Sequence, residues 1–200
     1  MNQQEQSSNP IFIAVRGMPG SGKSYIANEL VKSLGPDKVV LLDPDATDYE
    51  SEAYKAHVRA QIAEGVDPTL HAYRFLRAQA YDGIAEHKVV IWNQAFTNLE
   101  IFHKMIARLR DHAALHHVHL PILVVEVEID PAVAKERILQ RQRTGGHGAS
   151  DTTLAQRLDN YKLVSFAGEG YETVTVHGED DVSTSVATIM NALRKITNEG

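Results

Sequence analysis

The sequence predicts an α/β fold in which helices cover both faces of a mainly parallel sheet. Short apolar runs alternate with longer segments in which apolar residues recur at helical spacing. A glycine-rich turn joins the first apolar run to the first helical segment. Several apolar runs end in a polar side chain, at the edge where parallel sheets of this kind bind ligands.

The elements follow one another in a regular strand–helix order. Residues 11–15 form a continuous apolar run that predicts a buried strand. The helix that follows the turn ends at Gly35-Pro36, and Asp130-Pro131 has the form of an N-cap followed by proline at the first helical position. The full prediction is strands at 11–15, 39–42, 89–92, 122–127 and 173–176, and helices at 22–34, 50–64, 68–86, 99–115, 131–141, 152–165 and 182–196.

The glycine-rich turn matches the phosphate-binding pattern G-x-x-x-x-G-K-[ST] over residues 17–24. Its glycines let successive backbone N–H groups approach a phosphate, and the following helix adds the positive end of its dipole. Lys23 can reach the terminal phosphates of a nucleotide, and the Ser24 hydroxyl can bind Mg²⁺. The pattern predicts the three-layer P-loop NTPase (nucleoside-kinase-like) fold, with one nucleoside triphosphate and Mg²⁺ as ligands. The expected nucleotide-binding residues are Gly17, Pro19, Gly20, Ser21, Gly22, Lys23, Ser24 and Tyr25.

Polar residues follow two of the predicted strands. Asp43 and Asp45 come after strand 39–42, where a carboxylate can accept the proton of an attacking hydroxyl or hold a metal-bound water. We expect Asp43 to act as base and metal ligand, and Asp45 to contact the substrate. Strand 89–92 leads into Asn93 and Gln94 where many P-loop proteins carry an aspartate, so we expect Asn93 or Gln94 to orient a water or a substrate hydroxyl.

Two groups of arginines are candidates for binding anions. Arg137 and Arg141 are four residues apart on one helix face and lead into a glycine-rich stretch containing His147. Such arginines can neutralise charge in a transition state, so we expect a lid near residues 141–150. Arg74 and Arg77 lie on the helix between the second and third strands, where they could hold an anionic acceptor or be ordinary surface charges.

Composition limits the classes of function. The chain has 200 residues, a net charge of −6, 43% hydrophobic residues and no cysteine. We expect one domain over 11–200 after a flexible tail at 1–10, and a cytoplasmic location without a membrane span. The acidic balance weighs against nucleic acid as a partner. We expect Glu128 to lie past the end of strand 122–127, whereas Glu126 within it remains unexplained, because burying a carboxylate is costly.

Together these motifs resemble the P-loop kinases of the zeta-toxin and polynucleotide-kinase-like group. The resemblance rests on the P-loop, on Asp43-Pro44-Asp45 after a strand, and on the arginine helix that leads into Gly145-Gly146-His147. It implies transfer of the γ-phosphoryl group of ATP–Mg²⁺ to a hydroxyl of a small molecule, a nucleotide or a nucleotide sugar among the candidates. It also implies that Asp43 activates the acceptor, that Arg137 and Arg141 are lid arginines, and that a protein antitoxin or regulator is a partner to consider.

Two other functions stay open on the sequence. A polynucleotide 5′-hydroxyl kinase would use the same fold, and a basic groove would favour it. An NTP-binding regulatory protein without transfer activity is favoured by Asn93, since an amide cannot replace the charge of an aspartate. The arginines of the predicted lid weigh against this last function, because a protein that only binds a nucleotide gains little from neutralising transition-state charge.

Overall fold

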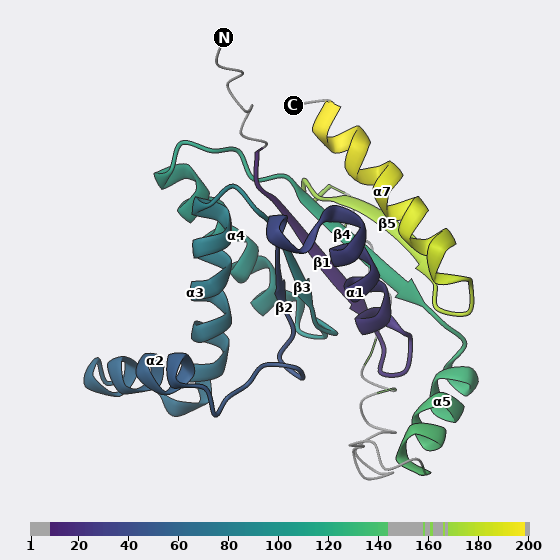
Figure 1. The fold of residues 1–200 in the computed structure, drawn as a ribbon, viewed down its shortest axis with the longest axis horizontal. Helices are drawn as coiled ribbons and strands as arrows, with labels where there is room; N and C mark the ends of the chain where they lie inside the picture. Colours follow the sequence, from purple (N-terminus) through teal and green to yellow (C-terminus); the bar gives the residue numbers. More distant parts are fainter. Residues whose placement is uncertain (1–8, 144–157, 159–160, 162–165, 167, 199–200) are drawn as a thin grey trace.

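The computed structural model describes residues 9–143, 158, 161, 166 and 168–198. Its core is a parallel five-stranded sheet in the order β2-β3-β1-β4-β5, with helices on both faces (Figure 1). The predicted fold class is therefore confirmed. The strands are β1 Ile11–Gly17, β2 Val39–Leu42, β3 Val89–Asn93, β4 Ile122–Glu128 and β5 Glu172–His177. The helices are α1 Lys23–Leu34, α2 Glu52–Ala63, α3 His71–Ala85, α4 Leu99–Leu115, α5 Pro131–Arg143 and α7 Val182–Asn198, with 3-10 turns at Pro36–Lys38 and Pro68–Leu70.

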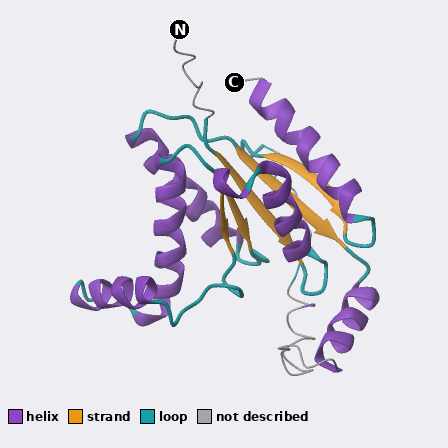
Figure 2. Cartoon of the chain, in the orientation of Figure 1, coloured by secondary structure: helices purple, strands orange, loops and turns teal. Residues whose placement is uncertain are grey.

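The alternation of side chains along each strand divides the core into two layers. Phe12 and Ala14 of β1 face α3 and α4, whereas Ile13 and Val15 face α1 and α7. Both faces of β1 are buried because it is the central strand, which explains why its sequence is continuously apolar rather than alternating. Figure 2 shows the helices on either side of the sheet, with α2 projecting away from it and α5 lying beyond the carboxyl ends of the strands.

Strand register brings the polar residues at the strand ends together. Leu42 of β2 pairs with Trp92 of β3, so Asp43 and Asn93 follow at neighbouring positions. Val15 of β1 pairs with Asn93, which places the start of the P-loop beside them. The carboxyl edge of β2, β3 and β1 is therefore where the polar side chains singled out in the sequence meet.

The structure differs from the prediction mainly at element ends. The helix expected at 68–86 begins as a 3-10 turn because Asp67 caps the Thr69 amide, and its α-helical part starts at His71. The third strand includes Asn93, and Glu128 is the last residue of β4 rather than lying beyond it. The glycine-rich part of the predicted lid, and nearly all of the helix expected at 152–165, fall outside the described residues.

A buried ionic cluster explains Glu126, for which the sequence offered no partner. Arg16 of β1 is 1% exposed, and its Nε lies 3.3 Å from Oε2 of Glu126, its register partner on β4. The Tyr161 hydroxyl donates a hydrogen bond to the other Glu126 oxygen. The Arg16 guanidinium lies 5.2 Å from the centre of the Tyr161 ring and 5.3 Å from that of Phe166. The carboxylate is thus paired and hydrogen-bonded, as a buried charge requires.

Among the described residues, no helix is both long enough and apolar enough to cross a membrane.

Candidate active site

The P-loop joins β1 to α1 in a tight glycine turn. Ser21 donates its backbone N–H to the Met18 carbonyl oxygen at 3.1 Å, and Gly20 and Gly22 have positive φ angles of 83° and 91°. Residues with a Cβ rarely adopt such angles, so glycine is required at both positions. Gly22 then directly precedes α1, and its carbonyl oxygen accepts from the Tyr25 and Ile26 amides. The turn therefore ends at a helix N-terminus, as phosphate binding needs.

Segments distant in the sequence enclose this loop. A Cβ added to Gly20 would lie 2.6 Å from the carbonyl oxygen of Ala134 in α5. A Cβ added to Gly178, in the turn after β5, would lie 2.0 Å from the Ser21 carbonyl oxygen. Both distances are too short for real Cβ atoms, so backbone from α5 and from the β5–α7 turn packs directly on the P-loop. Sequence reasoning missed Ala134 and Gly178, since no local motif marks them.

Lys23 is largely buried and lies among charged side chains. Burial lowers the pKa of its ammonium group. The carboxylates of Asp45 and Asp43 act in the opposite direction and raise it, whereas the charge of Arg141 lowers it further. The structure thus brings four of the predicted site residues into one electrostatic field. In the free protein, too little negative charge lies beside Lys23 and Arg141, and a bound polyphosphate would supply it.

Asn93 links the ends of two strands to the P-loop helix. Its Nδ2 donates to Ser24 Oγ at 2.9 Å and to Asp43 Oδ2 at 2.5 Å. The second Asp43 oxygen accepts the backbone N–H of Asp45 at 2.9 Å. Gln94, the other amide considered from the sequence, instead accepts from the Trp92 indole at 3.1 Å. The three residues expected at the metal and acceptor end therefore form one hydrogen-bonded set.

The oxygens of this set fit a hard divalent cation. The Ser24 hydroxyl and the Asp43 carboxylate are the ligand types that Mg²⁺ prefers, and Mg²⁺ needs few protein ligands because it keeps several waters. Asn93 faces both residues with its N–H₂ group, so it is no ligand of the same cation, and its buried Oδ1 has no hydrogen-bond partner in the described part of the chain. The residues present are thus compatible with Mg²⁺ held by Ser24 and Asp43.

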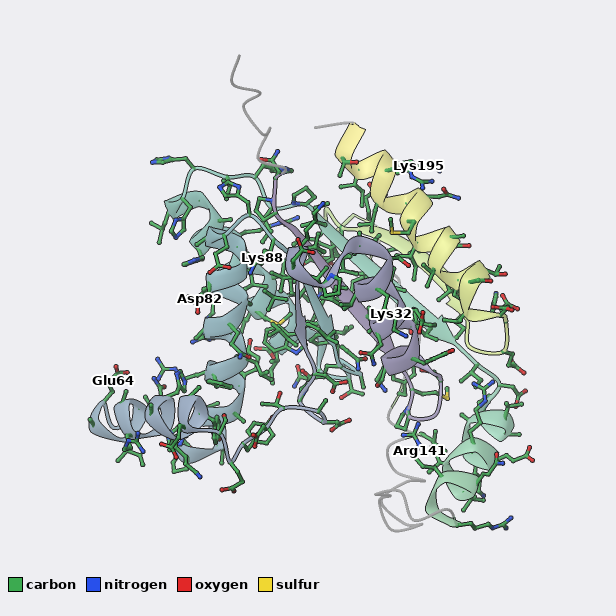
Figure 3. All side chains as sticks on the ribbon, in the orientation of Figure 1. Lys32, Glu64, Asp82, Lys88, Arg141 and Lys195 are labelled. Atoms are coloured by element: carbon green, nitrogen blue, oxygen red, sulfur yellow. The ribbon has the colours of Figure 1, made fainter. Side chains whose placement is uncertain are left out.

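Two of the three arginines of α5, Arg137 and Arg141, approach the P-loop. Arg137 Nη1 donates to the Gly178 carbonyl oxygen at 2.8 Å and lies 3.9 Å from the position of a Cβ on Gly22. Arg141 is close enough to affect Lys23, and Figure 3 shows it at the far end of α5, on the side toward the P-loop. Both arginines therefore approach the expected position of the phosphates, one beside the loop and one near its lysine.

The other predicted site residues have different surroundings. Tyr25 is 60% exposed at the start of α1. Arg77 lies over the rings of Tyr73 and Tyr81, at 5.5 and 5.9 Å, where it packs on aromatic side chains. The charge of Arg74 contributes to the lowered pKa of His57, whose largest cause is burial, so Arg74 belongs to the contact between α2 and α3. Their roles toward a ligand stay predictions.

Comparison with known families decides the assignment. The family model described as AAA domain, AAA_33, matches residues 12–164, which include the P-loop, Asp43, Asn93, Arg137 and Arg141. The chain belongs to this AAA domain family. No curated protein matches the chain.

Solved structures agree with this fold. A gluconokinase from Sinorhizobium meliloti 1021 is 19% identical, with 96% of this chain and 95% of that chain covered and a TM-score of 0.57. A protein from Chloroflexus aurantiacus j-10-fl with a provisional kinase designation is 18% identical, with 94% and 98% covered and a TM-score of 0.65. Kti12 from Chaetomium thermophilum, in complex with ADP-AlF3, is 16% identical, with 92% and 98% covered and a TM-score of 0.58. At these identities the likeness concerns the fold, that of a P-loop kinase.

Proposed function

We propose that this AAA domain protein is an ATP-dependent phosphotransferase that moves the γ-phosphoryl group to a hydroxyl of a small molecule. The observation that carries the proposal is the hydrogen-bonded set of Ser24, Asn93 and Asp43 beside the P-loop lysine. It puts a carboxylate next to the end of the nucleotide site where the terminal phosphate would lie. A protein that only binds a nucleotide does not need a proton acceptor there.

The chemistry follows from these positions. The acceptor oxygen forms a bond to the γ-phosphorus, the bond between that phosphorus and the β,γ-bridging oxygen of ATP breaks, and ADP leaves with the electron pair. Asp43 takes the proton of the acceptor hydroxyl. Lys23, Arg137 and Arg141 neutralise the charge on the transferring group and the leaving phosphates. Mg²⁺ bound by Ser24 and Asp43 would supply further positive charge at the phosphates.

The acceptor is the finer part of the proposal. The motif resemblance to the zeta-toxin and polynucleotide-kinase-like group favours a nucleotide or a nucleotide sugar, whereas the gluconokinase likeness favours a sugar acid. Arg74 and Asp45 lie on the segment between β2 and β3, so we assign them to the acceptor side. A protein regulator and a lid over 141–150 belong to the same proposal.

The decisive experiment is transfer of labelled γ-phosphate from ATP–Mg²⁺ to a panel of sugars, sugar acids, nucleosides, nucleotide sugars and 5′-hydroxyl oligonucleotides. D43N should bind ATP but lose about 10²–10⁴-fold in transfer, the usual contribution of a general base. D48N is the matched control, since Asp48 is an exposed aspartate of the same loop that caps the Glu50 amide. Labelling of oligonucleotides alone would replace the small-molecule acceptor by a polynucleotide.

A second candidate function is a nucleotide-dependent switch without transfer activity. It is favoured by Asn93, which stands at the end of β3 without the charge of an aspartate, and by the fold likeness to Kti12. A switch would bind and hydrolyse ATP without phosphorylating any member of the panel, and D43N would then leave hydrolysis within about tenfold of wild type.

A further inference from the structure

Asn93 is a buried polar side chain of the candidate site, and its two ends have very different surroundings. It is 3% exposed at the last position of β3. Both amide hydrogens are used, one toward Ser24 Oγ and one toward Asp43 Oδ2. Its Oδ1 is buried and has no hydrogen-bond partner in the part of the chain that the structure describes.

Chemistry fixes which way this amide points. An ionised carboxylate can only accept hydrogen bonds, so the amide must present its N–H₂ group to Asp43. Turning the amide over would place two oxygens 2.5 Å apart with no hydrogen between them. The Ser24 hydroxyl, on the same side of Asn93, therefore also accepts from the amide and keeps its own hydrogen for another acceptor.

We propose that Asn93 is a positioning residue, which holds the Asp43 carboxylate and the Ser24 hydroxyl in one geometry while adding no charge of its own. This inference rests on the proposed phosphotransferase function, to which it adds the way in which the base is aligned. Asp43 receives one donor on each carboxylate oxygen, from Asn93 and from the Asp45 backbone, so the carboxylate plane is fixed from both ends.

The same geometry explains why an amide suits this position better than an acid. An aspartate at the end of β3 would put a second carboxylate 2.5 Å from Asp43, and two acceptor-only groups at this distance repel each other where the amide of Asn93 donates a hydrogen bond. With asparagine the pair is a charge-assisted hydrogen bond in the metal-free protein, which is stronger than a neutral one. Asn93 therefore holds the side chains of Asp43 and Ser24 by direct hydrogen bonds.

A set of four variants tests the inference: N93A, N93D, D43N and the swap D43N/N93D. The swap exchanges the amide and the carboxylate but keeps one of each, at almost unchanged volume. Q94A is the matched control, because it removes the neighbouring amide, whose contact is with Trp92. Thermal unfolding is measured without nucleotide or metal, ADP affinity with and without Mg²⁺, and transfer in the assay of the proposed function.

The expected results separate positioning from bulk structure. N93D should lower the melting temperature of the metal-free protein by about 4 °C or more relative to wild type, and the swap should recover at least half of that loss. Mg²⁺ should raise the melting temperature of N93D more than that of wild type. N93A should lower kcat by about 10–100-fold with the KM for ATP changed less than about threefold, since it misaligns the base without removing it. Q94A should keep wild-type transfer.

Two outcomes would overturn the inference. A swap variant no more stable than N93D would show that the amide–carboxylate pair is not the interaction that matters. An N93A variant with wild-type melting temperature and wild-type kcat would show that Asn93 aligns nothing. If no protein in the set, wild type included, transfers phosphate but the swap recovers stability, the kinase proposal fails while the pairing of Asn93 with Asp43 stands.

Discussion

Arg137 and Gly178 meet across the P-loop: Arg137 Nη1, from α5, donates to the Gly178 carbonyl oxygen at 2.8 Å, in the turn after β5. The two residues are distant in sequence, yet both lie against the phosphate-binding turn, Arg137 beside Gly22 and Gly178 on Ser21. This contact joins the helix that carries the candidate lid arginines to the C-terminal strand. The shape of the nucleotide site thus depends on residues outside its motif.

We predict that G178A weakens nucleotide binding although Gly178 is not part of the P-loop motif. The new methyl group would lie 2.0 Å from the Ser21 carbonyl oxygen, so the backbone of the loop or of the turn must move. ADP affinity should fall at least about tenfold, the equivalent of one or two hydrogen bonds lost when the backbone donors to the phosphates are displaced. Isothermal titration measures it.

The control for this variant is G65A. Gly65 has a φ of 71° and open space around it, so alanine there introduces backbone strain away from the P-loop. G65A should lose stability while keeping wild-type ADP affinity. Equal ADP affinities for G178A and wild type would contradict the prediction, because they would mean that the turn after β5 moves to make room for the methyl group and leaves the P-loop unchanged.

R137A should lower turnover more than nucleotide binding. The guanidinium is already placed by Gly178, and its charge is most useful when negative charge develops on the transferring group. We expect kcat to fall about 100-fold or more, with the KM for ATP rising less than about tenfold. R59A, which removes an exposed arginine of α2, serves as the control and should behave as wild type. If R137A raised the KM for ATP and left kcat unchanged, Arg137 would contact the bound nucleotide without stabilising the transition state.

K23M should weaken nucleotide binding without destabilising the free protein. Burial lowers the pKa of Lys23, which shows that the charged form is costly in its place, and methionine of similar length removes that cost. We expect ADP affinity to fall about 10–100-fold, the equivalent of a lost charge-assisted hydrogen bond, while the melting temperature stays equal or rises. The exposed lysine of the same helix provides the control K32M. Calorimetry of both variants measures the two quantities, and a lower melting temperature for K23M would contradict the burial argument.

Y161F should cost stability in a way that depends on pH. Burial raises the pKa of Glu126 above its ordinary value of 4.5, and the hydrogen bond from Tyr161 partly lowers it again. The folded protein therefore holds this proton more tightly than the unfolded chain does. The contribution of Glu126 to the free energy of unfolding therefore grows as pH falls through the window between its raised pKa and 4.5, and it is lost as pH rises through that window.

Without the Tyr161 hydroxyl the pKa of Glu126 rises further, so that window widens. Near neutral pH we expect Y161F to cost about 1–3 kcal/mol, the usual cost of an unsatisfied buried acceptor. The difference from wild type should shrink on acidification, because a protonated Glu126 needs the donor less. Denaturant titrations at several pH values measure this, and a difference that is constant or grows toward acid would contradict the assignment.

The sequence was sufficient for the fold class and for the residues at strand ends. Local signals did this work: the P-loop pattern located the junction of β1 and α1, and Asp43 and Asn93 were found because parallel strands end at one edge. The pairing of Asn93 with both Ser24 and Asp43 was beyond sequence reasoning, because an amide at a strand end has many partners within reach. Glu126 was puzzling for the same reason, since its partners Arg16 and Tyr161 are fixed by strand register and by a distant segment.

The packing of Gly178 on Ser21 also makes the surroundings of the P-loop depend on a segment late in the chain. The chain up to the end of α5 already contains the whole P-loop motif, the proposed base Asp43, and Arg137 and Arg141. It still lacks the turn that covers Ser21 and the carbonyl oxygen that receives Arg137. The surroundings of the P-loop are therefore complete only when β5 has joined the sheet, so the candidate nucleotide site depends on the C-terminal part of the chain as well as on its own motif.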